Sequence, residues 1–318
     1  MKKLYIILVS CFVFSALNAQ QEEQFSQFMY NKLAFNPAYA GSKDGICFTA
    51  VSRNQWIGGP EGTPQSQLLT FSMPMFGRKV GLGATVSRHT IGLTERISAE
   101  VSYAYRIPVA LGYLSMGIQG SVRLIRINFS EAVTTQPTGT DGAIPGDLQS
   151  KYIPNFGAGL YYHNTRFFIG VSAPRLLGNS IDLAEDDVII TREVPHIYFT
   201  GGMRWDLNAN LQFQPQVLLK YVRNAPFEGD ANVNFIFMNR FTTGVSYRLG
   251  GSKRSGIGEA VGLIGGIQIS DELFLGLSYD YTLSEIRYTT GGSVEAVVRY
   301  CIGGQSDDAA EFVSPRFF

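Results

Sequence analysis

Apolar and polar residues alternate with a period of two along most of this chain. Between positions 97 and 107 the odd-numbered residues are apolar, whereas the even-numbered residues from 96 to 106 are mostly charged or small. The same alternation returns at 211–221, 273–282 and 294–302. Because successive side chains of a β-strand point to opposite faces, this pattern predicts strands with one apolar and one polar face.

About fourteen such segments follow one another, and the connections between them differ in length. The segments lie at 45–54, 65–76, 79–89, 95–107, 112–129, 152–163, 166–175, 193–206, 209–222, 230–238, 241–250, 258–269, 272–284 and 289–302. Tight turns are expected at 77–79, 108–112, 164–165, 207–208, 239–240 and 270–271, and longer stretches at 130–151, 176–191, 223–229 and 251–257. Short turns on one rim and long loops on the other are typical of outer-membrane barrels.

Two other all-β architectures fit the pattern less well. A β-sandwich alternates faces but does not sort its loops by rim, and a propeller would show a repeat of ~40–50 residues. We therefore expect an all-β, transmembrane outer-membrane antiparallel barrel of about 14 strands over residues 45–302. A short N-terminal periplasmic or plug segment is expected at 20–44, and a C-terminal periplasmic tail at 303–318.

Composition narrows the class of protein. The 318 residues are 45% hydrophobic and only 16% charged, with 35 Gly, 22 Phe and 16 Tyr, and the mean hydropathy is +0.04. Beyond the first 20 residues no apolar run approaches the ~18 residues that a transmembrane helix needs. Basic and acidic residues number 26 each, so no net positive charge indicates nucleic-acid binding.

The first 19 residues indicate export. Lys2 and Lys3 precede an apolar run at 4–17, and Ala19 then precedes polar residues. This layout is that of a secretory signal peptide cleaved after Ala19, and the apolar run is too short for a membrane anchor. Together with the barrel pattern, it predicts an integral protein of the bacterial outer membrane.

Motifs for catalysis and cofactor binding are missing from the sequence. It contains no GxSxG, HExxH, P-loop or GxGxxG motif, so we expect no enzyme activity and no cofactor. The acidic residues at 182–187 could bind calcium through carboxylate oxygens. We favour a solvated loop face for this cluster.

Charged residues on the polar face of the strands are expected to point into the barrel. These residues are Arg96, Glu100, Arg106, Arg123, Lys220, Asp280, Glu295 and Arg299. Charges of both signs can pair inside a barrel and fill or narrow its lumen. We interpret them as structural packing of a polar interior rather than as a substrate channel.

Two cysteines, Cys47 and Cys301, remain after cleavage of the signal peptide. Closure of the barrel makes the first and last strands neighbours, and both cysteines share the lumen-facing parity of Arg53 and Arg299. A disulfide needs Cα atoms within ~7 Å, and hence a closure register that the sequence does not provide. We expect two free thiols.

The stretch before the first strand carries the most specific pattern. Residues 23–42 read EQFSQFMYNKLAFNPAYAGS, and Arg53-Asn54-Gln55-Trp56 and Gly62-Thr63-Pro64-Gln65 follow. Near the end stand Ser278-Tyr279-Asp280-Tyr281 and Gly292-Ser293-Val294-Glu295. These motifs resemble the PorP/SprF family, outer-membrane proteins of the Bacteroidetes type IX secretion system and its gliding motility machinery. Val294 departs from the family pattern, which more often has His at this position.

The resemblance implies a non-enzymatic component of type IX protein secretion. Such a protein would contact periplasmic secretion components and assist export or surface attachment of a large adhesin or other cargo. The motif residues that could contact partners are Gln27, Tyr30, Asn31, Phe35, Asn36, Pro37, Ala38, Tyr39, Gly41, Arg53, Gln55 and Trp56. The alternative is an outer-membrane channel for small or hydrophobic solutes.

The N-terminal segment also has a physical reading of its own. Pro37 fixes its φ angle and pushes Asn36 toward an extended conformation, and Gly41 permits a bend just before the first strand. Five aromatic residues between 25 and 39 give the segment enough apolar area to dock on the barrel. It could therefore plug the periplasmic mouth or enter the lumen.

Overall fold

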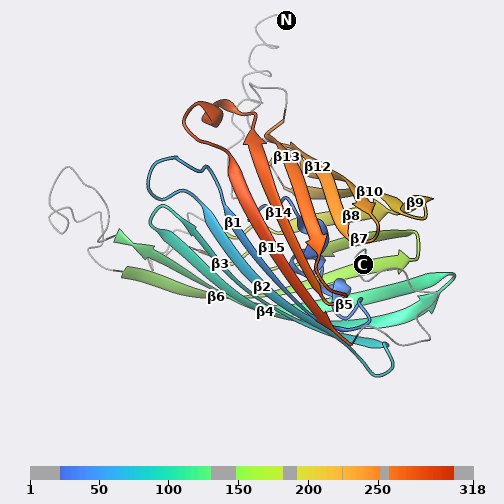
Figure 1. The fold of residues 1–318 in the computed structure, drawn as a ribbon. Helices are drawn as coiled ribbons and strands as arrows, with labels where there is room; N and C mark the ends of the chain where they lie inside the picture. The colour runs from blue at the N-terminus through green and yellow to red at the C-terminus, as the bar shows by residue number, and fades with distance from the viewer. Residues whose placement is uncertain (1–21, 130–147, 182–191, 224, 251–257, 304–318) are drawn as a thin grey trace, which may run out of the picture.

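The computed structural model describes residues 22–129, 148–181, 192–223, 225–250 and 258–303. They form one antiparallel sheet that closes on itself (Figure 1). The strands are β1 (Ile46–Asn54), β2 (Gln65–Met75), β3 (Val80–Ile91), β4 (Thr94–Val109), β5 (Gly112–Asn128), β6 (Leu148–Asn164), β7 (Phe167–Ala173), β8 (His196–Met203), β9 (Trp205–Asn208), β10 (Leu211–Val222), β11 (Glu228–Phe237), β12 (Phe241–Leu249), β13 (Ala260–Gln268), β14 (Leu273–Thr282) and β15 (Ser293–Ile302). Four 3₁₀ turns are described: η1 (Phe28–Tyr30), η2 (Lys32–Ala34) and η3 (Pro37–Tyr39) before β1, and η5 (Glu285–Tyr288) between β14 and β15. Within these ranges no helix is long and apolar enough to cross a bilayer.

Two pairings close the barrel: β15 pairs with β1, and β10 pairs with β11. β8 and β9 together occupy one position in the wall, because both pair with β10. The wall is therefore a 14-strand antiparallel barrel, and the fold expected from the sequence is confirmed. The segment expected as one strand at 193–206 is interrupted at Arg204, whose backbone N–H donates to the Arg166 carbonyl at 2.8 Å.

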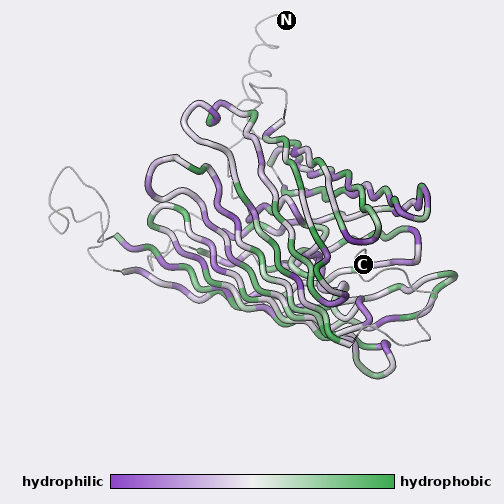
Figure 2. Tube along the Cα trace, viewed as in Figure 1, coloured by the Kyte–Doolittle hydropathy of each residue, from purple (hydrophilic) through white to green (hydrophobic). Residues whose placement is uncertain are grey.

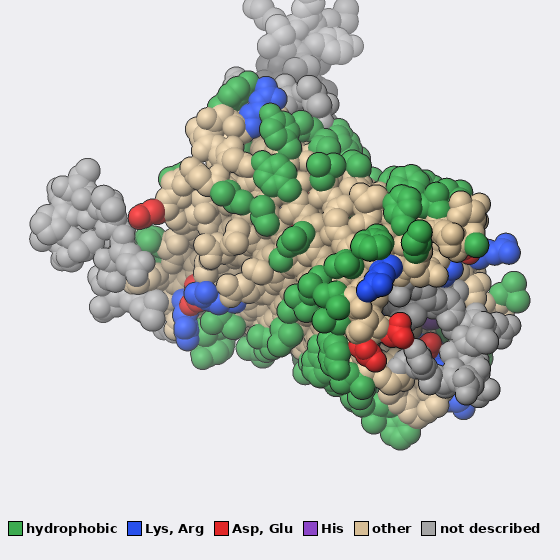
Figure 3. Space-filling model, viewed as in Figure 1, with side chains coloured by type: hydrophobic (Ala, Val, Ile, Leu, Met, Phe, Trp, Pro, Cys, Tyr) green, Lys and Arg blue, Asp and Glu red, His purple; other side chains and the backbone are tan. Residues whose placement is uncertain are grey.

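Hydrophobic and hydrophilic residues alternate along the strands of the wall (Figure 2), so the two faces of the wall differ. Outward apolar side chains are exposed, among them Val101 at 66% and Leu263 at 64%. Figure 3 shows hydrophobic side chains spread over the visible outer face. Inward polar side chains such as Ser98 and Gln119 are buried. An apolar outer face suits lipid, and a closed ladder leaves no sheet edge unpaired in it.

Tight turns lie on one rim of the barrel and long connections on the other, with one exception. The turns after β2, β4, β6, β11 and β13 are tight and share a rim with the start of β1 and the end of β15. The opposite rim carries the long connections after β1, β7 and β14. On that long-loop rim, however, β3 and β4 are joined by Gly92 and Leu93 alone, because Gly92 adopts a φ of 54° that allows a tight reversal.

The chain before β1 lies inside the barrel rather than at its mouth. From β1 at the short-turn rim, residues 43 back to 22 extend through the lumen toward the long-loop side; we call residues 22–43 the plug. Its side chains are almost all buried, with Phe28 at 1% and Ala38 at 0% exposure. The signal peptide at 1–19, the acidic cluster at 182–187 and the tail from 304 onward lie outside the described residues.

The expectation of two free thiols is wrong in this structure. Cys47 and Cys301 are direct partners in the β1–β15 register, with Cα atoms 4.1 Å apart, and form a disulfide. The sequence predicts that both cysteines lie on neighbouring strands. The closure register, which decides whether they meet, depends on contacts around the whole barrel.

We predict that denaturing alkylation of the mature protein without reductant labels no cysteine, and that reduction exposes two thiols. Because each cysteine lacks a second partner, the variant Cys301→Ser should show one free thiol at Cys47 without reductant. Mass spectrometry of the alkylated protein measures both numbers. Labelling of both cysteines in the unreduced wild type would contradict the disulfide.

Candidate functional site

The start of the plug is held by a carboxylate from the last strand. Glu295 on β15 accepts the backbone N–H of Ser26 and that of Gln27, each at 2.8 Å, and its side chain is fully buried. The Gln27 amide donates back to the Glu295 carbonyl at 3.2 Å. Charge-assisted hydrogen bonds of this kind are about twice as strong as neutral ones. The C-terminal motif therefore binds the N-terminal motif.

Arg53 on β1 joins this contact to a second carboxylate. Its guanidinium lies 2.7 Å from Asp280 and 3.1 Å from Glu295, and it donates to the Ser26 hydroxyl at 2.9 Å. The Ser26 hydroxyl donates in turn to Asp280. Arg248 adds a further bond to Ser26 Oγ at 3.1 Å. We call these five residues the Ser26 cluster. It brings together residues 23–42, 53–56, 278–281 and 292–295, four of the five stretches that carry the family resemblance.

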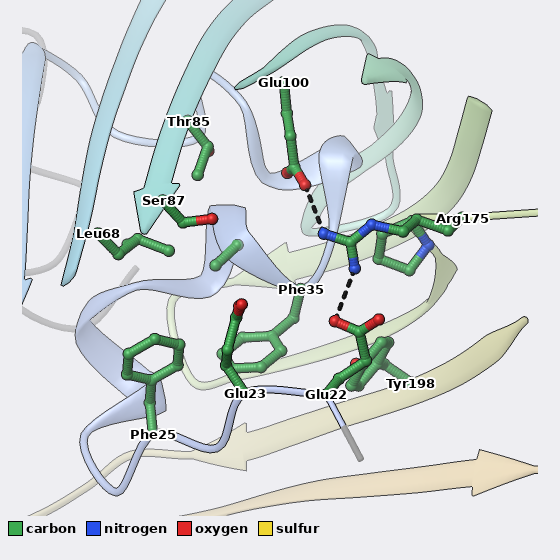
Figure 4. A pocket seen from close by; sticks show the side chains of 12 residues that line it. Glu22, Glu23, Phe25, Phe35, Leu68, Thr85, Ser87, Glu100, Arg175 and Tyr198 are labelled. Carbon is green, nitrogen blue, oxygen red and sulfur yellow. Dashed lines mark hydrogen bonds and ion pairs between the residues drawn. The ribbon is translucent and has the colours of Figure 1, made fainter. Parts of the chain in front are cut away.

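A second ion-pair group binds the N-terminal end of the plug (Figure 4). Glu22 lies 2.9 Å from Arg175 and 3.1 Å from Arg123. Arg175 also pairs with Glu100 at 2.8 Å, and Arg123 with Glu193 at 2.9 Å. Burial alone would raise the pKa of the Glu22 carboxyl, but the two guanidinium groups outweigh it and hold that pKa well below its usual range. Glu22 is therefore a fixed anion in the lumen.

Glycines in the wall make room for the middle of the plug. Asn36 accepts the backbone N–H of Ala38 and donates to the Leu160 carbonyl, both at 2.9 Å. A Cβ added at Gly117 would lie 2.3 Å from the Ala38 nitrogen, and one at Gly159 would lie 2.2 Å from Asn36 Oδ1. Only glycine allows the plug backbone to approach these strands so closely. Pro37 is the first residue of the turn η3, which contacts both β5 and β6, the strands that carry these glycines.

The backbone of the plug also lies close to the wall just before β1. Gly41 has a φ of 64°, and its N–H donates to the Ser72 hydroxyl at 2.8 Å. Arg106 donates to the Gly41 carbonyl. A Cβ at Gly81 would lie 1.9 Å from the Ala40 carbonyl oxygen. The bend expected at Gly41 is thus built against β3.

Aromatic rings of the plug pack on aromatic rings of the wall. The pairs are Tyr30 with Phe274, Phe35 with Tyr198 and Tyr39 with Tyr161, with centroids 4.4, 5.5 and 5.4 Å apart. Two buried apolar clusters result, each with members from both plug and wall. The apolar core of this protein therefore lies inside its lumen.

The remaining motif residues lie apart from the plug. Gln55 and Trp56 are half-buried in the connection after β1, on the long-loop rim. The Trp56 N–H donates to Ser293 Oγ at 3.4 Å, and Ile57 bonds the Gly292 carbonyl at 2.8 Å. These residues join two rim loops.

Of the eight charges expected in the lumen, Glu100, Arg123, Asp280 and Glu295 form the tight ion pairs described above. Arg106 bonds the Gly41 carbonyl instead, and Arg299, Lys220 and Arg96 also lie outside those pairs. The Lys220 ammonium is buried about 4.0 Å from Asp230, and Arg96 is half-buried. Asp230 in turn accepts from Arg248 at 2.6 Å. Neither Asp230 nor Arg248 was singled out in the sequence, although both share the polar parity of their strands.

Positive charge gathers at the short-turn end of the plug. Arg299 stacks over Tyr30 and Phe274, and the Lys32 ammonium lies 3.6 Å from the centre of the Phe168 ring. Burial lowers the pKa of Lys43, and the charge of Arg299 lowers it further. Neither lysine is among the charges expected in the lumen from the sequence. In the described ranges, no group of three or more His, Cys, Asp or Glu side chains is placed to hold a metal ion.

We predict that Gly117→Ala destabilises the protein by ~1–3 kcal/mol, because the added methyl group forces the plug backbone away from β5. Urea unfolding in detergent measures this change in the free energy of unfolding. Gly120→Ala is the matched control, since a Cβ at Gly120 in the same strand meets nothing within 4 Å. Equal stability of the two variants would mean that the plug does not lie against Gly117.

We predict that Arg53→Met costs ~3–5 kcal/mol in the free energy of unfolding, because it leaves the buried Glu295 without its cation and leaves Asp280 with only Arg248, at 3.8 Å. Arg88→Met is the control. Arg88 pairs with Glu95 at 2.6 Å, but its side chain is 51% exposed, so its loss should cost less than ~1 kcal/mol. Similar losses for both variants would contradict a central role for Arg53.

Comparison with known proteins agrees with this architecture. The CymD monoaromatic hydrocarbon channel matches with a TM-score of 0.50 and 10% identity, over 87% of this chain and 92% of that one. The toluene transporter TbuX of Ralstonia pickettii gives 0.50 and 11%, over 87% and 93%. No curated protein matches the sequence. The model of the type IX secretion system membrane protein PorP/SprF family matches residues 17–300, and the chain therefore belongs to this family.

Proposed function

We propose that this outer-membrane barrel is a closed, non-enzymatic part of type IX secretion that assists export or surface attachment of a large adhesin or other cargo. The observation that carries the proposal is the plug. Cavities beside it measure only about 10, 20 and 30 Å³, room for single water molecules. A barrel filled in this way supports assembly with other proteins better than passage of solutes.

The position of the motif residues suggests how partners are met. Most of them, from Gln27 to Gly41, are buried in the lumen and hold the plug in place. Because these residues are not accessible, we expect periplasmic secretion components to contact the short-turn rim. There the plug leads into β1 and the disulfide links β1 to β15. Family membership supports such partners.

The second candidate is a channel for small or hydrophobic solutes. It is favoured by the barrel likeness to CymD and TbuX, which are named as a hydrocarbon channel and a toluene transporter. At 10% and 11% identity this likeness concerns the fold alone. In planar bilayers a channel should conduct steadily, whereas the plugged protein should not.

We predict that Asn36→Ala combined with Pro37→Ala yields a folded, heat-modifiable barrel in the outer membrane that fails in secretion or surface display. The double variant removes the bonds to Ala38 and Leu160 and frees the backbone at η3, while every strand stays intact. Surface immunodetection of secreted proteins in the native host, with Asn210→Ala in an exposed turn as control, measures the effect.

Normal secretion by the double variant would reduce the plug to a structural leader. Steady conductance of the wild type, together with normal secretion, would favour the channel instead. Loss of secretion without conductance supports the closed secretion component.

A further inference from the structure

The short-turn end of the lumen holds a buried ammonium group with no counter-charge beside it. Lys43 is 8% exposed, and its Nζ atom has no hydrogen-bond partner. The adjacent carboxylate, Asp44, is engaged elsewhere, 3.1 Å from Arg78. Within the described residues, no carboxylate lies within ion-pair distance of Lys43 or of Arg299, which is 3% exposed.

An unpartnered amide lies in the same place. Asn31 is 2% exposed, and neither its Nδ2 nor its Oδ1 atom has a hydrogen-bond partner. Asn31 and Lys43 both line one small cavity of about 20 Å³, together with Tyr39, Thr49 and other polar residues of the plug and wall. Buried polar groups in proteins are rarely left unpaired, so two such groups facing one cavity indicate a missing ligand.

The surrounding charge selects the sign of that ligand. Arg299 stands directly opposite Thr49 in the β1–β15 pairing, so a second cation flanks the cavity. The carboxylates of the lumen gather instead around Ser26 and Arg175, toward the long-loop side. A buried cation without a counter-ion costs several kcal/mol, and for this reason burial disfavours the ammonium form of Lys43. An anion in the cavity would offset this cost and keep the ammonium charged.

The size of the cavity limits the ligand further. A cavity of about 20 Å³ admits about one water-sized sphere. We propose that this cavity is a binding site for one monatomic anion, a halide, held by the Lys43 ammonium and the Asn31 amide between plug and wall. The ion completes the contact of the plug with the start of β1. This inference does not depend on the role in secretion.

The test is equilibrium dialysis of the full-length purified protein in detergent against radioactive chloride, with gluconate keeping the ionic strength constant. We expect saturable binding of one chloride per protein. Lys43→Met should weaken it at least about tenfold, because a charge-assisted contact is lost. Lys79→Met, an exposed lysine in the turn after β2, should bind chloride like the wild type.

A second measurement covers the case in which Lys43→Met does not fold. Wild-type crystals soaked in bromide should show one anomalous peak between Lys43 Nζ and the Asn31 amide. Absence of saturable chloride binding, binding unchanged in folded Lys43→Met, or crystals without this peak would each overturn the proposal and leave a water in the cavity. If the protein binds chloride as expected but proves to have no part in secretion, the proposed function is rejected and this binding site is not.

Discussion

A buried carboxylate needs hydrogen-bond donors in place of water. Glu295 accepts hydrogen bonds from two backbone N–H groups of the plug and pairs with Arg53. Electrostatic interactions are strong in such a buried site, and an unpaired member would be costly. The chain at Ser26 is therefore fixed in register against β1 and β15, the two strands that close the barrel. The position of the plug and the closure of the wall depend on the same contact.

The plug gives this barrel an apolar core that its wall could not form alone. The inward face of the strands is largely polar, while the outward face is apolar and suits lipid. Rings such as Phe28 and Phe35 supply the apolar surface, and inward wall residues such as Phe274 and Tyr198 meet it. Glycines at the approach points let backbone lie against backbone. The lumen is packed like a protein interior rather than open like a pore.

The sequence predicts the features that depend only on the alternation of side chains along a single strand. Alternation located the strands and assigned Arg53, Asp280 and Glu295 to the lumen. It could not bring them together with Ser26, because that contact joins residues 269 positions apart and depends on the full circuit of strands. The Cys47–Cys301 pair was missed for the same reason. Arg175 was missed because its position has the outward parity of the strand expected at 166–175, whereas β7 ends at Ala173 and the alternation no longer holds beyond it.

The disulfide at the seam also changes the topology of the molecule. It joins residues 254 positions apart, so the whole wall becomes one covalent ring. The plug precedes Cys47 and lies inside this ring, as the tail of a lasso lies inside its loop. A protease that cuts one surface loop between the cysteines therefore opens the chain without separating it. The two fragments stay joined at the seam, and the threaded tail stays attached to both.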